Sequence, residues 1–211
     1  MNRSSNMTKE ITYFNAPGRG NTSDTLALAK KRAQDLGLRY TVVASTTGRT
    51  GVLAAETFAD TGIEVIVVTE HYGYKTEGEW FMKDEYLSRL KELNVRVMTQ
   101  SHALSGVERS ISKQVGGSSR VEAIAEAFRR LFGVGVKVCV EVTIMAADSG
   151  FIPVGPEVEV MAIGGMAGGA DTAVVVRPAH MNNFFDLEVR EIVCMPRSKK
   201  MRPGTETSGL E

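Results

Sequence analysis

Hydrophobic and polar positions along this chain alternate between patterns typical of buried strands and spacings typical of helices. The segment 63–69 is β-branched and apolar on both faces near its end, as is typical of a strand covered on both sides. Apolar residues recur at helical spacing from Leu26 to Leu36 and again from Val121 to Phe132. Repeated strand–helix–strand units predict a three-layer α/β/α sandwich with a mainly parallel sheet.

Seven strands and five helices are expected in this sandwich. Segment 136–148 has no turn residues and ends near Gly150, which favours a buried helix although the segment is rich in β-branched residues. The hairpin-like pair at the C-terminal end is expected to add antiparallel strands at one edge of the sheet. The expected strands are 11–14, 41–45, 63–69, 95–99, 157–163, 171–176 and 189–195, and the expected helices are 22–36, 50–60, 83–93, 119–132 and 136–148.

The chain is expected to form one domain. A length of 211 residues can bury a single core. We predict a disordered leader at 1–9, a single α/β domain at 10–196 and a flexible tail at 197–211. A membrane span needs about 20 mostly apolar residues in a row, and the sequence offers neither such a run nor the apolar centre of a signal peptide. We therefore expect a cytoplasmic protein with no membrane partner.

Composition and charge narrow the classes of function. The chain carries 25 basic and 25 acidic residues, and this balance argues against a nucleic-acid partner. Cys139 and Cys194 lie inside apolar runs, and no Cys/His cluster has metal-ligand spacing, so neither a disulfide nor a metal site is expected. Neither G-x-S-x-G nor H-E-x-x-H occurs. Whether the protein is an enzyme stays open.

The most informative stretch is the turn between the strand at 41–45 and the helix at 50–60. It supplies hydroxyl groups, a glycine and one arginine where the helix begins. The unpaired N–H groups of a helix's first turn and the helix dipole favour an anion. A surface ion pair is the alternative interpretation for the arginine. We predict a phosphate site formed by Ser45, Thr46, Thr47, Gly48, Arg49 and Thr50.

Other polar loops also follow expected strands. Ligands of open α/β sheets bind outside the carboxyl ends of the strands, so these loops are expected to converge on one edge. All three histidines, His180 included, follow strand candidates. The turn at 164–169 is interpreted as a hairpin connection, and Lys137 with Glu141 as a structural i, i+4 pair. The further candidate ligand-binding residues are Asn15, Gly18, Asn21, Thr22, His71, Tyr72, Gly73, Ser101 and His102. Plain turn chemistry is an equal alternative for Gly18.

The unit from Leu26 to Thr69 resembles the C-terminal α/β domain of pyruvate kinases. In that domain a strand ends in T-x-S-G-R-[ST]-A, and the loop holds a phosphate of an allosteric sugar bisphosphate. Residues 45–50 match the loop in type, with Ser45 in place of the usual Thr and Gly51 in place of the usual Ala. The later stretches VCVEVTIMAADSG, GGADTAVVVRPAH and FFDLEVREIVCMPR are similar to stand-alone, archaeal-type relatives of this domain.

The resemblance implies flavin mononucleotide (FMN) as the cofactor, because similar stand-alone proteins are associated with it and have no other assigned role. The phosphate is then expected at 45–50, and the positions of the loops, not the resemblance, suggest Phe14, His71, Tyr72 and His102 for the flavin ring. The catalytic barrel of pyruvate kinase is absent, so no pyruvate kinase activity is expected. A homo-oligomer is expected by analogy. Two alternatives stay open: a sensor module for a sugar phosphate, and a small hydrolase or transferase that uses His102 or His180.

Overall fold

The computed structural model describes residues 6–199. Segments 1–5 of the expected leader and 200–211 of the expected tail lie outside the described residues. In chain order the elements are β1 (Thr12–Phe14), η1 (Arg19–Asn21), α1 (Thr22–Asp35), β2 (Tyr40–Ala44), α2 (Arg49–Phe58), β3 (Glu64–Thr69), α3 (Asp84–Glu92), β4 (Arg96–Thr99), α4 (Val107–Val115), α5 (Arg120–Leu131), α6 (Val134–Asp148), β5 (Val160–Gly164), β6 (Thr172–Arg177), η2 (Met181–Asp186) and β7 (Glu188–Pro196).

The strands form one seven-stranded sheet in the order β1-β7-β6-β5-β2-β3-β4. Strand β6 is antiparallel to both of its neighbours, and all other pairs are parallel. The α/β fold with a mainly parallel sheet is therefore confirmed. The expected position of the antiparallel strand at an edge is wrong, because β1 and β7 lie beyond β6, with Thr12 opposite Cys194. Hydrophobic pattern does not encode which distant strands pair.

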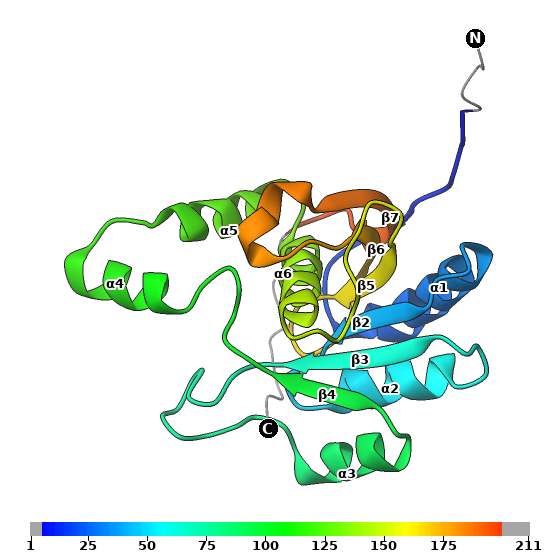
Figure 1. The fold of residues 1–211 in the computed structure, drawn as a ribbon, viewed down its shortest axis with the longest axis horizontal. Coiled ribbons are helices and arrows are strands. Elements are labelled where there is room, and N and C mark those ends of the chain that lie inside the picture. Colours follow the sequence, from blue (N-terminus) through cyan, green and yellow to red (C-terminus); the bar gives the residue numbers. More distant parts are fainter. Residues whose placement is uncertain (1–5, 200–211) are drawn as a thin grey trace.

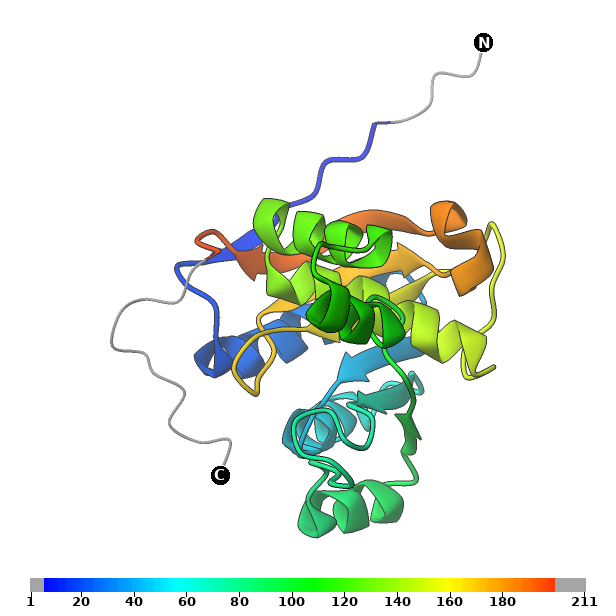
Figure 2. The same cartoon turned by 90° about the vertical axis from the view of Figure 1, so that its left-hand side faces the viewer.

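Helices cover both faces of the sheet (Figure 1). Helices α1, α2 and α3 share one face and enclose a core with Leu26, Phe58 and Leu90. Helix α6 lies on the other face, and α5 packs outside it, as Figure 2 also shows. These two layers of helices give the predicted sandwich.

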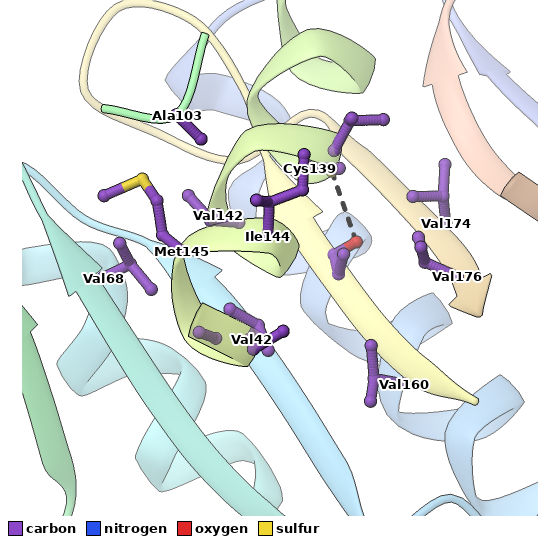
Figure 3. Packing of buried hydrophobic residues seen from close by; sticks show 14 of the residues in the cluster. Val42, Val68, Ala103, Cys139, Val142, Ile144, Met145, Val160, Val174 and Val176 are labelled. Atoms are coloured by element: carbon purple, nitrogen blue, oxygen red, sulfur yellow. Dashed lines mark hydrogen bonds between the residues drawn. The ribbon is translucent and has the colours of Figure 1, made fainter. Parts of the chain in front are cut away.

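Helix α6 is the buried helix that the sequence favoured. It is apolar nearly all round because the sheet covers one side and α5 covers the other. Figure 3 shows Ile144 and Met145 of this helix among valines of the sheet. The Cys139 thiol donates a hydrogen bond to the carbonyl oxygen of Ala162 in β5, 3.4 Å away. The helix is thus held against the middle of the sheet.

The sequence did not predict α4, which stands at the side of the molecule next to α5 (Figure 1). None of the residues of α4 is buried, and Val107 is 75% exposed. Its nine residues lie between Gly106 and Gly116, in a segment to which the sequence analysis assigned no element. Among the helices of residues 6–199, none is long and apolar enough to cross a bilayer.

Candidate functional site

The turn between β2 and α2 begins the candidate site. Gly48 is the N-cap of α2 and has a left-handed backbone with φ 97°. A side chain at Gly48 would place its Cβ 2.5 Å from the sulfur of Met82, so only glycine fits. Ser45 Oγ accepts a hydrogen bond of 3.1 Å from the backbone N–H of Gly51 in the first turn of α2. The hydroxyl-rich sequence therefore builds a compact start to this helix.

A cavity of about 290 Å³ opens at this turn. It lies over the carboxyl ends of β2 and β3 and beside the turn 165–169 that follows β5, with the N-terminal part of α6 along one wall. The hydroxyl-bearing residues Thr46, Thr47 and Thr50 line it. Two helices, α2 and α6, begin at the cavity, and the positive ends of both helix dipoles favour an anion there.

Basic side chains outnumber acidic ones around the cavity. The basic residues are Lys75, Arg109, Arg129 and Lys137, and the acidic residues are Glu70 and Glu141. The lysines and arginines come from the loop after β3, from α4, α5 and α6, four segments far apart in sequence. An excess of positive charge in a partly enclosed site favours a multiply charged anion.

Lys137 and Glu141 form an ion pair one turn apart on α6, with only 4% and 5% of their surfaces exposed. Glu141 uses Oε2 for the Lys137 ammonium, and its Oε1 accepts a hydrogen bond of 2.9 Å from the backbone N–H of Leu104. Burial lowers the pKa of Lys137, and Glu141 opposes that shift. Because both residues line the cavity, this pair belongs to the site.

Three rings meet at the cavity wall. The ring of His102 lies 5.1 Å from those of His71 and Tyr74, and His71 and Tyr74 are 5.6 Å apart. Burial lowers the pKa of His102 to about 4, so this imidazole is neutral near pH 7. Tyr74 and His102 themselves line the cavity and provide an aromatic flank.

The structure brings only part of the sequence-predicted set to the cavity. The residues that line it are Ser45, Thr46, Thr47, Thr50 and His102. His71 contacts the site through the ring of His102. The other candidates do not line the cavity: Asn15, Gly18, Asn21, Thr22, Gly48, Arg49, Tyr72, Gly73 and Ser101.

Arg49 is the main departure from the sequence-based site, because it is exposed and does not line the cavity. The first helical residue turns outward when Gly48 directs the chain into α2. Tyr72 is also exposed and stacks on Trp80 at 5.4 Å between ring centroids. Arg49 and Thr50 are neighbours in sequence at the start of α2, yet only Thr50 lines the cavity.

The loop after β1 has a structural role. The backbone N–H of Gly18 donates to Oδ2 of Asp171, a residue just before β6, at 2.9 Å. Thr22 Oγ1 accepts from the backbone N–H of Ala170 at 3.1 Å and donates to the carbonyl oxygen of Arg19. These bonds fasten the N-terminal loop to the glycine-rich turn, which itself lines the cavity.

His180 lies at the opposite edge of the sheet from His102. It follows β6, the antiparallel strand, and its Nδ1 is 3.0 Å from Oδ1 of Asp148 at the end of α6. The expectation that all three histidines share one edge is therefore wrong. A strand's direction cannot be read from its own residues, and this one reversal moves His180 to the far side.

Sequence reasoning missed several cavity residues, among them Glu70, Arg109 and Arg129. The buried pair on α6 was noticed but interpreted as structural only. Its signal was available, because a lysine and a glutamate within an otherwise apolar helix need an explanation. No sequence pattern links the arginines of α4 and α5 to the turn after β2, since only the fold brings them together.

A comparison with known protein families agrees with this architecture. Residues 23–176 match the family described as pyruvate kinase, alpha/beta domain. A pyruvate kinase from Cryptosporidium parvum is similar at 14% identity and a TM-score of 0.37, over 74% of this chain and 22% of that one. An NH3-dependent NAD synthetase from Campylobacter jejuni, in complex with nitrate, gives 11% identity and a TM-score of 0.35 over 67% of this chain and 54% of that one. An O-ureido-L-serine synthase gives 16% identity and a TM-score of 0.28 over 67% of this chain and 51% of that one. The chain thus spans about a fifth of the length of the pyruvate kinase.

Proposed function

The chain belongs to the pyruvate kinase alpha/beta domain family, and we propose that it binds a phosphorylated small molecule in the cavity at the start of α2. One observation carries the proposal: four basic side chains and two helix N-termini surround one cavity lined by threonine hydroxyls. The phosphate lies against Thr46, Thr47 and Thr50, where hydroxyls and first-turn amides donate hydrogen bonds. Arg109 and Arg129 supply the compensating charge, since Lys137 is already paired with Glu141.

FMN is the first ligand that we propose, because the resemblance to stand-alone relatives implies it and the residues present fit it. Its single terminal phosphate suits the α2 turn, and the neutral ring of His102 with Tyr74 offers an aromatic flank for a flavin ring. A bound flavin would supply hydride or single-electron transfer chemistry. The chain's own residues bind and orient the ligand.

A sugar phosphate is the second candidate, favoured by two properties of the cavity. Its volume of about 290 Å³ is small, at the lower end of the roughly 300–1,000 Å³ typical of small-molecule pockets. Its lining of threonines and charged side chains suits the hydroxyl groups of a sugar. In this case the protein is a sensor that recognises a phosphorylated metabolite without redox chemistry.

The absorption spectrum of the purified protein and thermal melting with a ligand panel test these proposals. The panel is FMN, riboflavin, fructose 1,6-bisphosphate and inorganic phosphate. A ligand at a hundred times its Kd stabilises the native state by about 2.7 kcal/mol. We expect FMN to raise the melting temperature and riboflavin, which lacks the phosphate, to raise it much less. A shift with the sugar bisphosphate alone would support the sensor, and no shift with any phosphate ester would refute both.

Two neighbouring arginines of α5 provide a matched pair of variants. Both interact with Glu126, but only Arg129 lines the cavity, and the Arg130 side chain is 78% exposed. Loss of a hydrogen bond to a charged group costs about 1.5–3 kcal/mol. Arg129→Ala should therefore weaken FMN binding about tenfold or more, whereas Arg130→Ala and the exposed Arg49→Ala should leave the Kd unchanged.

A further inference from the structure

Glu70 lies directly after β3, and one of its carboxylate oxygens is buried without a hydrogen-bond donor from the described part of the protein. Its Oε2 is fully buried and has no hydrogen-bond partner among residues 6–199. A buried, unsatisfied carboxylate oxygen is costly, and such atoms are rare in folded proteins. Because Glu70 lines the cavity, a rotation of its side chain would bring this oxygen into contact with a ligand there.

The surroundings of Glu70 place this oxygen next to the phosphate-binding turn. Lys75, the side chain of Thr46 and His71 all act to lower the pKa of the Glu70 carboxyl. Burial outweighs these three influences and leaves the pKa of Glu70 raised. Thr46 therefore connects the phosphate-binding turn to an acceptor group, and both belong to one cavity wall.

We propose that Glu70 turns its unsatisfied Oε2 toward the cavity when a ligand binds and selects that ligand by accepting a hydrogen bond from a hydroxyl group close to the phosphate. This inference rests on the proposed phosphate site. It assigns the ligand to the class of hydroxylated phosphate monoesters, in which a carbon near the ester oxygen bears a hydroxyl. The ribityl chain of FMN and the open or cyclic forms of sugar phosphates both belong to this class.

The same geometry predicts which phosphate esters are rejected. A plain alkyl phosphate has no hydroxyl to donate to Oε2. It therefore lacks the binding free energy of that hydrogen bond and binds more weakly. An ester with a second anionic group near the phosphate brings like charge to the carboxylate. Sites that present a buried polar group discriminate strongly against ligands that cannot pair with it.

Two small probes isolate this hydrogen bond: sn-glycerol 3-phosphate, which has a hydroxyl near the ester, and n-propyl phosphate, which has none. Titrations followed by amide NMR shifts of residues 45–51 give both dissociation constants even when binding is weak. We expect the wild type to bind glycerol phosphate about tenfold or more tightly than propyl phosphate, the ratio that corresponds to a hydrogen bond to a charged group.

Glu70→Met removes the acceptor and Glu70→Gln keeps one amide oxygen. The preference should vanish in the Met variant and shrink in the Gln variant, while propyl phosphate binds at least as well as before because a negative charge is gone. Glu77→Gln, an exposed change in the same loop, should retain the full preference. The melting temperature of the Met variant should equal or exceed that of the wild type, since an unsatisfied buried oxygen has been removed.

Three results would overturn the inference. Equal affinities of the wild type for the two esters, or a preference that survives Glu70→Met, would remove Glu70 from ligand selection and leave the phosphate site intact. Failure of the wild type to bind either ester would overturn the phosphate site together with this inference. The two failures are therefore distinguishable in one set of titrations.

Discussion

The buried pair on α6 offers the sharpest test of the energetics of this site. Lys137→Met removes the cation and leaves the Glu141 carboxylate with the Leu104 N–H as its remaining partner. Removing one member of a buried ion pair costs about 3–5 kcal/mol, because the other charge stays buried without compensation. With 5% of the Glu141 surface exposed, solvent cannot take the place of the lost partner. We therefore expect a loss of unfolding free energy in that range.

A double variant separates the cost of an unpaired charge from the value of the pair. In Lys137→Met/Glu141→Gln the glutamine oxygen still accepts from the Leu104 N–H, and no charge remains buried. Replacing a buried pair as a whole is often neutral or stabilising. The double variant should lie within about 1 kcal/mol of the wild type, so the coupling energy is about 3 kcal/mol or more.

The free energy of unfolding is measured by urea titration, followed by far-ultraviolet circular dichroism and by the fluorescence of Trp80. The four proteins of the cycle are the wild type, Lys137→Met, Glu141→Gln and the double variant. The ion pair between Arg130 and Glu126, with side chains 78% and 46% exposed, is the matched i, i+4 control on α5. Its coupling should be below about 1 kcal/mol, as is usual for exposed pairs. If the two single changes on α6 add within about 0.5 kcal/mol in the double variant, the reasoning about an uncompensated charge is refuted.

Three further predictions concern the same edge of the sheet. Since the pKa of His102 is about 4 in the folded protein and about 6.5 when unfolded, the unfolded chain binds a proton first as the pH falls. Stability should drop by up to about 3 kcal/mol between pH 6.5 and 4, and His102→Gln should abolish that contribution in pH-dependent urea titrations. Ser45→Ala removes the acceptor for the Gly51 N–H and should cost about 1 kcal/mol, measured in the same way; no change would mean that water replaces the hydroxyl. Gly48→Ala should lower the melting temperature by several degrees because of its positive φ and the adjacent methionine sulfur, whereas Gly20→Ala, with open space around it, should not.

The elements of this fold were largely predictable because each one depends on local pattern. The capping box at Ser119 and Glu122 was visible in the sequence, and both of its hydrogen bonds are present. The apolar segment that became α6 was ambiguous, since burial on all sides removes the amphipathic signal that distinguishes a helix from a strand. Strand order was not predictable, and β1 joined an edge that no local feature of Thr12–Phe14 indicates.

The sequence by itself determined that a hydroxyl-rich turn leads from a buried strand into a helix, and therefore where the candidate anion site lies. That information is local, because capping and helix polarity depend on residues within one turn of each other. Only the tertiary structure decided which charges surround that turn. It brought Arg109, Arg129 and Lys137 to the cavity, turned Arg49 outward and sent His180 to the far edge. Such placements follow from strand direction and the packing of distant helices, which no short stretch of sequence encodes.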